Sequence, residues 1–300
     1  MCGLLAYLST DAARVTDATV SDVQSALQCL HHRGPDDTRV WTDPNVVLGF
    51  NRLSIIDVDG SPQPLPYADG RYRILFNGEI YNYLELREEL TAAGATLTTH
   101  GDTETIVAGY HLWGEAIVPK LRGMFAFVIW DTHTRTAFGA RDPFGIKPLF
   151  RARLADGGLG FSSEKKALLE MLGGSKAAGG VDPASLQHYL TLQYVPEPAT
   201  LHRGIGRIES GTTFTVVDGE LATKRYFHPT FRPNPVPAGR EQELYDRIAD
   251  VLDESVAKHM RADVTVGSFL SSGIDSTAIA ALAKRYNPTL MTFTVGFERE

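Results

Sequence analysis

The order of strand-forming and helix-forming segments constrains the fold of this 300-residue chain more than any other feature. Short alternating or β-branched apolar runs fill the first part of the chain and return after residue 120. Two helix-forming segments, 82–93 and 103–113, stand together between these strand groups. Strict alternation of strands and helices would instead favour a parallel α/β domain. The pattern therefore predicts an α+β domain in which sheets and helices form stacked layers.

The local patterns predict the individual elements of this first domain. Expected strands cover residues 2–7, 46–50, 53–58 and 72–76, followed by hairpins that pair 124–130 with 136–140 and 149–153 with 159–162. A further helix is expected over 20–30, with Ser21 as its cap and Gly34 and Pro35 as its stop signals. Residues 61–66 contain three prolines, which cannot donate to a sheet ladder, so a loop is expected there.

The character of the chain changes near residue 240. A connector with a helix near 183–189 and a hairpin turning at Asp218-Gly219 leads into residues 231–240, where three closely spaced prolines indicate a linker. An amphipathic helix over 241–260 follows, then a β-rich run at 264–270, a Ser/Gly turn, a helix over 277–286 and a second strand over 290–297. This is one βαβ unit of a parallel α/β domain. One unit cannot cover both faces of its own sheet, so we expect the second domain to be unfinished at Glu300.

Composition excludes several functional classes. The formal net charge is −7, from 29 basic and 36 acidic residues, and there is no basic block, which disfavours nucleic-acid binding and a polybasic membrane anchor. Neither a signal peptide nor an apolar run of about 18 residues appears, so no membrane span is expected. The only cysteines are Cys2 and Cys29, and neither CxxC nor HExxH occurs, which argues against disulfides and zinc. The sequence predicts a cytoplasmic protein.

Cys2 is the first candidate catalytic residue. If Met1 is removed, Cys2 carries both a thiol and a free α-amine, whose ordinary pKa is roughly 7.7–8.0. The amine could then accept the proton of the thiol, as in N-terminal-nucleophile enzymes. A cysteine can also follow the initiator methionine by chance, so the weight of Cys2 depends on the residues that accompany it.

A glutamine amidase built on Cys2 would need an oxyanion hole, a clamp for the substrate carboxylate and an anion for its ammonium group. Asn77-Gly78 offers a side-chain amide and a backbone N–H at a predicted turn, although Asn-Gly is also a common hairpin turn. Arg52, at the head of a predicted strand, suits carboxylate binding or a surface salt bridge. Asp102 begins a helix and could be simply its N-cap. The conjunction of these residues, in this order, is what favours an amidase.

A second candidate site lies at Ser271-Ser272-Gly273-Ile274-Asp275-Ser276. A strand, a Ser/Gly turn and a helix N-terminus present backbone N–H groups to an anion, which is a phosphate-binding geometry. The stretch is not a Walker A loop, because that motif requires a lysine. A plain βα turn has the same pattern, so the residues alone leave both interpretations open.

The chain resembles the class II glutamine amidotransferase domain in a series of motifs, which are MCGLLAY, HHRGPDD, NRLSIID, FNGEIYNYLELREEL, GDTE, LRGMFAFVIWD and ARDPFGIKPLF. Its later part is similar to the glutamine-hydrolysing (B-type) asparagine synthetase family in VPEPATLHRGI…ESG and FLSSGIDSTAIAALA. This resemblance implies a four-layer αββα N-terminal-nucleophile hydrolase domain, followed by the start of a parallel α/β adenylate-forming (PP-loop ATP pyrophosphatase) domain. The expected boundaries are 1–195 for the glutaminase, 196–240 for the connector and linker, and 241–300 for the start of the synthetase domain.

The resemblance also implies residue roles. Cys2 would be the nucleophile after removal of Met1, and Arg52 would clamp the glutamine carboxylate. Asn77 and Gly78 would be the oxyanion donors, while Glu79 and Asp102 would face the substrate amino group. In the second domain, the residues implied to bind ATP are Leu270, Ser271, Gly273, Asp275, Ser276 and Val295. Mg²⁺ is expected near Asp275, and no metal is expected in the glutaminase domain. Ser272 stands where the family usually has glycine, which would weaken ATP binding if that position needs a positive φ or a close phosphate.

The implied activity is glutamine-dependent asparagine synthesis. Glutamine is hydrolysed through a thioester, and the ammonia attacks a carboxylate that ATP has activated as an acyl-adenylate. The implied partners are glutamine, aspartate and ATP, without nucleic acid or membrane, and a homodimer is considered. Alternatives are another acceptor such as diaminopimelate in cell-wall precursors, glutaminase activity alone, fusion to a different synthase, or a non-catalytic regulatory protein. The SSGIDS loop argues against the different synthase, and the intact amidase residues argue against a non-catalytic protein.

Overall fold

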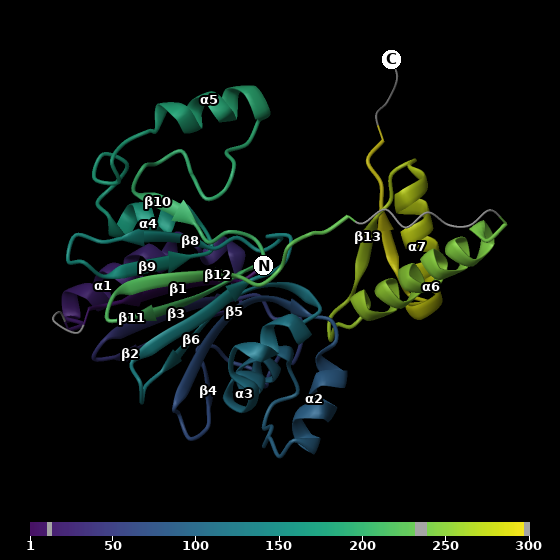
Figure 1. Ribbon diagram of the computed structural model, residues 1–300, viewed down its shortest axis with the longest axis horizontal. Helices are drawn as coiled ribbons and strands as arrows, with labels where there is room; N and C mark the ends of the chain where they lie inside the picture. Colours follow the sequence, from purple (N-terminus) through teal and green to yellow (C-terminus); the bar gives the residue numbers. More distant parts are fainter. Residues whose placement is uncertain (11–13, 232–238, 297–300) are drawn as a thin grey trace. The chain divides into compact units, whose positions relative to one another are not determined.

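The structure, a computed structural model, describes residues 1–10, 14–231 and 239–296 (Figure 1). It consists of two compact units. The first comprises Met1–Ser54 and Asp59–His228, and the second comprises Ile55–Val58 and Pro229–Glu300. Of the predicted linker at 231–240, the segment 232–238, with all three of its prolines, lies outside the described residues.

Two antiparallel sheets, each with six strands among the described residues, form the centre of the first unit. The first sheet has the order β10 (Ile205–Arg207), β8 (Phe150–Arg153), β9 (Leu159–Ser162), β1 (Gly3–Leu8), β3 (Val46–Arg52) and β2 (Asp37–Asp43). The second has the order β12 (Glu220–Arg225), β11 (Thr212–Val217), β7 (Thr136–Arg141), β6 (Gly123–Asp131), β5 (Tyr72–Ile80) and β4 (Leu65–Tyr67). Both predicted hairpins, β6–β7 and β8–β9, are present with the expected pairing.

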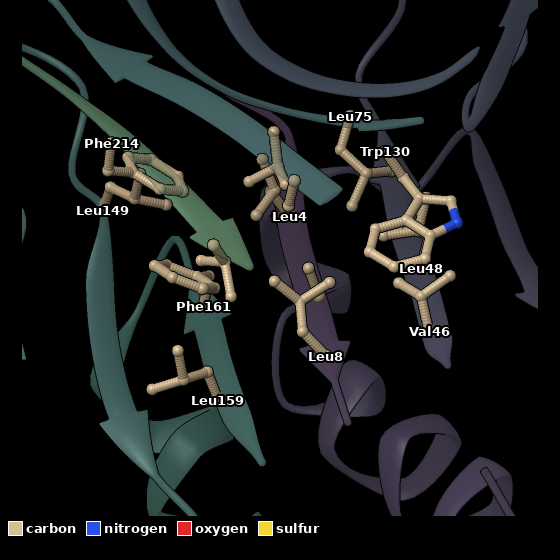
Figure 2. Close-up of a cluster of buried hydrophobic side chains, with 14 of the residues drawn as sticks. Leu4, Leu8, Val46, Leu48, Leu75, Trp130, Leu149, Leu159, Phe161 and Phe214 are labelled. Atoms are coloured by element: carbon tan, nitrogen blue, oxygen red, sulfur yellow. The ribbon is translucent and has the colours of Figure 1, made fainter. Parts of the chain in front are cut away.

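The side chains of β1 alternate between two buried environments. Leu4 and Leu8 point toward the second sheet, where they join a cluster that includes Leu75, Trp130 and Phe214 (Figure 2). Leu5 and Tyr7, which alternate with them, join a different cluster, with side chains of the helices on the outer face of the sheet. Because successive side chains of a strand face opposite sides of a sheet, a strand buried on both sides is apolar throughout. The continuous apolar run at residues 3–8 has this origin.

Helices cover the outer face of each sheet and complete the four-layer αββα order (Figure 1). On the first sheet lie α1 (Asp17–Gln28) and α4 (Lys165–Met171), through Val23, Leu27 and Leu168. On the second lies α3 (Asp102–Trp113), where Tyr110 stacks on Phe138 of β7 with ring centroids 4.7 Å apart. Helix α2 (Tyr83–Ala92) packs beside α3. The remaining helices of this unit are η1 (His31–Arg33), η2 (Gly114–Lys120) and α5 (Pro183–Leu192). The predicted α+β fold class is confirmed.

Two corrections concern the strands that carry site residues. Residues 53–58 form no strand: β3 ends at Arg52, and both backbone polar groups of Leu53 contact the Cys2 thiol instead of a neighbouring strand. Arg52 therefore lies at the end of a strand, not at its head. Asn77-Gly78 is not a turn, because β5 continues to Ile80 and pairs with β6 along its whole length.

Three further predictions near the chain start were incomplete or wrong. The cap of α1 is Thr16, which forms a capping box with Thr19, and not Ser21. Part of the predicted proline loop belongs to β4, where Pro66 is tolerated because β4 is an edge strand. Strand β2 was not predicted, because its exposed, charged residues hide the apolar signal of a strand that pairs on one edge only.

The second unit contains the predicted βαβ arrangement. Helix α6 (Glu241–His259) precedes β13 (Gly267–Phe269), α7 (Ile274–Tyr286) and β14 (Met291–Phe293). Strands β13 and β14 are parallel, with Gly267 opposite Met291, which confirms the predicted strand direction. Both strands are shorter than predicted, and residue 297 of the expected second strand lies outside the described residues. In the described part of the chain, no helix has the length and apolar character needed to cross a membrane.

Candidate active site

Cys2 lies directly before β1, the strand between β9 and β3 in the first sheet. Its Sγ accepts a hydrogen bond from the Leu53 N–H at 3.4 Å and lies 3.6 Å from the Leu53 carbonyl oxygen. Burial raises the pKa of the Cys2 thiol, although the Leu53 N–H and the charge of Arg52 act in the opposite direction. The resting side chain is therefore a thiol, which needs a base before it can act as a nucleophile.

Arg33 holds the main chain of Cys2. Its Nε donates to the Cys2 carbonyl at 2.8 Å, and its Nη1 donates to Glu164 at 2.8 Å. Sequence reasoning assigned no role to Arg33 or Glu164, although Arg33 belongs to the HHRGPDD motif. A hydrogen bond from an arginine side chain to a main-chain carbonyl produces no periodic pattern in the sequence. The HHRGPDD motif is therefore the only sequence feature that indicates Arg33.

The outer edge of β5 is where the second group of site residues lies. Asn77 pairs with Ala126 of β6. Opposite Gly78, the Phe125 N–H donates to the Asp142 carboxylate and the Phe125 carbonyl accepts the Asp142 N–H. The N–H and carbonyl of Gly78 therefore point away from β6. Even-numbered residues of β5 thus present their N–H and carbonyl groups to the side where β4 lies.

Successive positions of this edge are filled by different groups. Leu65 of β4 lies opposite Ile74, the Gln63 side chain bonds the main chain of Phe76, and the Asp102 carboxylate accepts the Ile80 N–H at 3.0 Å. Gly78 lies between the last two positions, and its N–H forms no hydrogen bond with any of the described residues. We call this position the Gly78 gap. It leaves one main-chain donor available beside a buried carboxylate.

The side chain of Asn77 is buried without a partner. It is 1% exposed, and neither its Nδ2 nor its Oδ1 forms a hydrogen bond within the described part of the chain. It shares a face of β5 with Leu75, which belongs to the cluster between the sheets against which Cys2 also packs. An unsatisfied buried polar group costs about 1–3 kcal/mol. Such a group calls for a functional explanation.

Gly78 cannot carry a side chain in this structure. A Cβ there would lie 2.2 Å from the Met124 carbonyl oxygen and 2.8 Å from the Phe125 Cα, both of them main-chain atoms of β6. The close approach of β6 therefore requires glycine at the gap.

Asp102 is the first residue of α3 and is 5% exposed. The N-cap is Gly101, so the interpretation of Asp102 as the cap is wrong. Burial, with a contribution from the nearby charge of Glu79, raises the pKa of Asp102 to about 7. Two carboxyl groups this close, one of them kept partly protonated near neutral pH, form a site that favours a cation.

The loop before Asp102 is fixed by Glu104. This buried carboxylate accepts hydrogen bonds from the backbone N–H and the hydroxyl of both Thr98 and Thr99, at 2.7–2.9 Å. Burial opposes ionisation of Glu104, but these bonds hold its pKa below the ordinary value. Arg87 also donates to Glu104 and to the Gly101 carbonyl.

Two cationic side chains flank the thiol. Arg52 is 8% exposed, and its charge acts on Cys2. Lys147, which sequence reasoning did not select, is also buried, and burial lowers its pKa while the nearby Glu79 and Cys2 act in the opposite direction. The structure thus brings Arg52 and Asp102 within electrostatic reach of Cys2, and Glu79 within electrostatic reach of Asp102.

The predicted phosphate loop of the second unit follows β13. The Ser271 hydroxyl accepts the Gly273 N–H at 3.2 Å and lies 2.9 Å from the Ser276 hydroxyl, so side chains fold the loop back onto the start of α7. Ser272 is absent from the residues with positive φ in the described structure, which removes one reason for requiring glycine there. The Leu270 N–H donates to the Phe293 carbonyl at 2.8 Å, and Val295 is 81% exposed.

Asp275 supplies a carboxylate in the first turn of α7. Within the described residues no cluster of three or more His, Cys, Asp or Glu side chains could hold a metal by itself. Mg²⁺ at nucleotide sites usually takes one or two carboxylates and completes its shell with phosphate oxygens and water. A single Asp275 therefore fits a magnesium–nucleotide complex better than a bare metal ion.

The αββα sandwich, with Cys2 directly before an internal strand of the first sheet, is a fold that a known glutamine amidotransferase shares. The glutamine phosphoribosylpyrophosphate amidotransferase of B. subtilis has a similar fold: the TM-score is 0.52 at 17% sequence identity, over 98% of this chain and 65% of that one. Residues 1–227 match the family model described as "Glutamine amidotransferase domain". The chain belongs to the family of glutamine amidotransferase domains.

Residues 247–300 match the family model described as "Asparagine synthase". Asparagine synthetase [glutamine-hydrolyzing] 1 of Bacillus subtilis is 44% identical over all of this chain and 46% of its own length. A Mycobacterium tuberculosis protein provisionally named asparagine synthetase [glutamine-hydrolyzing] is 54% identical over all of this chain and 48% of its own length. The chain thus spans about half the length of these curated relatives.

Proposed function

We propose that the first unit hydrolyses glutamine to glutamate and ammonia at Cys2. The observation that carries the proposal is the pair of unused donors on β5, the buried Asn77 amide and the Gly78 N–H, on a strand whose Leu75 belongs to the cluster against which Cys2 packs. Preorganised donors of this kind stabilise the oxyanion that forms when a nucleophile attacks an amide carbonyl. No structural role accounts for leaving the Asn77 amide unsatisfied.

The reaction follows from these positions. Cys2 Sγ attacks the side-chain carbonyl carbon of glutamine while its proton passes to the α-amine that Cys2 acquires when Met1 is removed. The tetrahedral oxygen accepts hydrogen bonds from Asn77 Nδ2 and the Gly78 N–H. The amine then returns the proton to the leaving nitrogen, which departs as ammonia and leaves a thioester. Water then attacks the thioester carbon while the amine takes a proton from it, the C–S bond breaks, and the amine returns the proton to the Cys2 sulfur as glutamate is released.

The charged side chains around Cys2 would select glutamine among amides. Arg52 is proposed to bind the α-carboxylate, and Asp102 with Glu79 is proposed to bind the α-ammonium group. Asp102 is nearly buried with a pKa of about 7, so an ammonium group placed there would favour its ionised form. The site therefore suits an α-amino acid amide.

Glutamate release by the purified protein tests this proposal. With Met1 removed, the wild type should release glutamate and be alkylated at Cys2 by a glutamine-mimicking electrophile, and Cys2→Ala should do neither. Cys29, at the end of α1, supplies the matched control, since Cys29→Ala should retain both reactions. Wild-type protein with a free Cys2 that neither releases glutamate nor becomes labelled would refute the proposal.

The ammonia is proposed to serve asparagine synthesis from aspartate and ATP in the whole protein, with residues 1–195 as the glutaminase part, 196–240 as the connection and 241–300 as the start of the synthetase part. The asparagine synthase match over residues 247–300 supports this. The residues proposed to bind ATP are Leu270, Ser271, Gly273, Asp275, Ser276 and Val295, with Mg²⁺ near Asp275. The proposed location of the protein is the cytoplasm. The identity of the acceptor is tested in the whole protein by aspartate-dependent release of pyrophosphate from ATP, with diaminopimelate as the competing acceptor.

A further inference from the structure

One of the two side chains that bound the Gly78 gap is that of Gln63, and the other is that of Asp102. Gln63 is 5% exposed and precedes β4 in the chain. Its Oε1 accepts the Phe76 N–H at 2.6 Å, and its Nε2 donates to the Phe76 carbonyl at 3.2 Å. A side-chain amide here makes the two hydrogen bonds that a neighbouring strand residue would make.

Gln63 also reaches the helix that carries the buried acid. Its Nε2 lies 3.4 Å from the Thr103 hydroxyl, and Thr103 follows Asp102 in α3. One buried amide therefore joins the residue before Asn77 to the residue after Asp102. Because both partners adjoin site residues, a displacement of Gln63 would move β5 relative to α3.

We infer that Gln63 is a positioning residue that holds the oxyanion donors of β5 in place. Its side chain occupies the N–H and carbonyl of Phe76 and leaves the next N–H on this edge, that of Gly78, available for an oxyanion. The inference rests on the proposed glutaminase function. Gln63 is not expected to contact the substrate. It acts through β5, by fixing the direction of the Gly78 N–H and of the Asn77 side chain relative to Cys2.

The role of oxyanion donors predicts which kinetic parameter changes when the Gln63 side chain is replaced. Oxyanion donors stabilise the tetrahedral state more than bound glutamine, so a displaced donor pair lowers kcat and leaves KM nearly unchanged. Gln63→Met keeps the volume of the side chain and removes all three hydrogen bonds. We expect kcat for glutamine to fall about 10- to 100-fold, less than the 10²- to 10³-fold expected when a donor itself is removed.

An aldehyde analogue of glutamine provides an independent readout. The Cys2 thiol adds to the aldehyde, and the oxygen of the resulting hemithioacetal occupies the oxyanion position without any leaving group. Its inhibition constant should weaken by the same factor as kcat falls. Combining Gln63→Met with Asn77→Ala should cost little more than Asn77→Ala alone, because both changes act on one donor pair.

A matched control separates positioning from loss of stability. Asp131 is a similarly buried polar residue at the far end of β6, where it accepts hydrogen bonds from Arg71 and from the His133 and Thr134 N–H groups. Asp131→Asn should lower stability and leave kcat and the aldehyde inhibition constant unchanged. Gln63→Asn, which retains the amide on a shorter side chain, replaces the methionine variant if that variant does not fold.

The outcomes are distinguishable. A wild type that does not hydrolyse glutamine refutes the proposed function and this inference with it. An active wild type whose Gln63 variants keep the wild-type kcat and aldehyde affinity refutes the inference alone. The same holds if the Gln63 variants change only KM, or if Asp131→Asn, at an equal loss of stability, lowers kcat as much as the Gln63 variants do.

Discussion

Replacing Asp102 with asparagine should change how the stability of the first unit depends on pH. The folded-state pKa of Asp102 is about 7 against an ordinary value of 3.8, because burial disfavours its charge. A carboxyl whose pKa is raised by folding contributes stability at low pH, and this contribution is lost as pH rises from about 4 to about 7. A shift of about three units corresponds to about 4 kcal/mol. Asparagine cannot ionise and can keep an oxygen acceptor for the Ile80 N–H, so the variant should not show this loss.

Urea unfolding followed by tryptophan fluorescence measures the effect. The three tryptophans, Trp41, Trp113 and Trp130, all lie in the first unit, so their signal reports on that unit. The difference in unfolding free energy between Asp102→Asn and the wild type should move in favour of the variant by about 4 kcal/mol between pH 4 and pH 8. Taking the difference removes the titration of other groups. If the unfolding free energies of the variant and the wild type change in parallel over this pH range, burial does not raise the pKa of Asp102, and the reasoning fails.

Three other predictions concern the same site and the second unit. Asn77→Ala should lower kcat for glutamine by about 10²- to 10³-fold in steady-state assays and leave urea stability nearly unchanged, because it removes atoms that have no partners; a large loss of stability would contradict this. Gly78→Ala should destabilise the first unit by about 1–3 kcal/mol or more, because its Cβ meets main-chain atoms of β6, and unchanged thermal unfolding would show that β6 can move away. In the whole protein, Ser272→Gly should leave KM for ATP unchanged if backbone conformation alone matters, since Ser272 has no positive φ; a lower KM would point to crowding of a phosphate.

The sequence was sufficient to predict most of the first unit because its layers leave strong periodic signals. The buried run of β1 and the hairpin of β6 and β7 are apolar for reasons that local composition reveals. Strand β2 was missed because it lies at an edge and is largely exposed. Isoleucine and valine are frequent in strands and predict a strand at residues 53–58, whereas the backbone N–H and carbonyl of Leu53 contact the Cys2 thiol.

The sequence predicts which residues are candidates for the site but not how they are arranged in space. Asn77 and Gly78 were selected as donors, yet a turn was expected where the structure has a continuous strand. What makes Gly78 available is the register of β5 against β6 and the side chain of Gln63, and neither follows from the residues near Gly78. Arg33 and Lys147 act from distant parts of the chain, so only the fold could reveal their approach to Cys2.

The pairing of β1 has a consequence for the order in which the site can assemble during synthesis. The candidate residues from Cys2 to Asp102 are synthesised before two of the strands that pair with their own strands. Strand β5 pairs along its length with β6, which ends at Asp131, and β1 pairs with β9, which ends at Ser162. A nascent chain shorter than about 160 residues thus carries the nucleophile with only one of the two strands that flank β1. The last neighbours of the reactive thiol, Lys147 and the β9 side of the sheet, are added only when translation has passed β9.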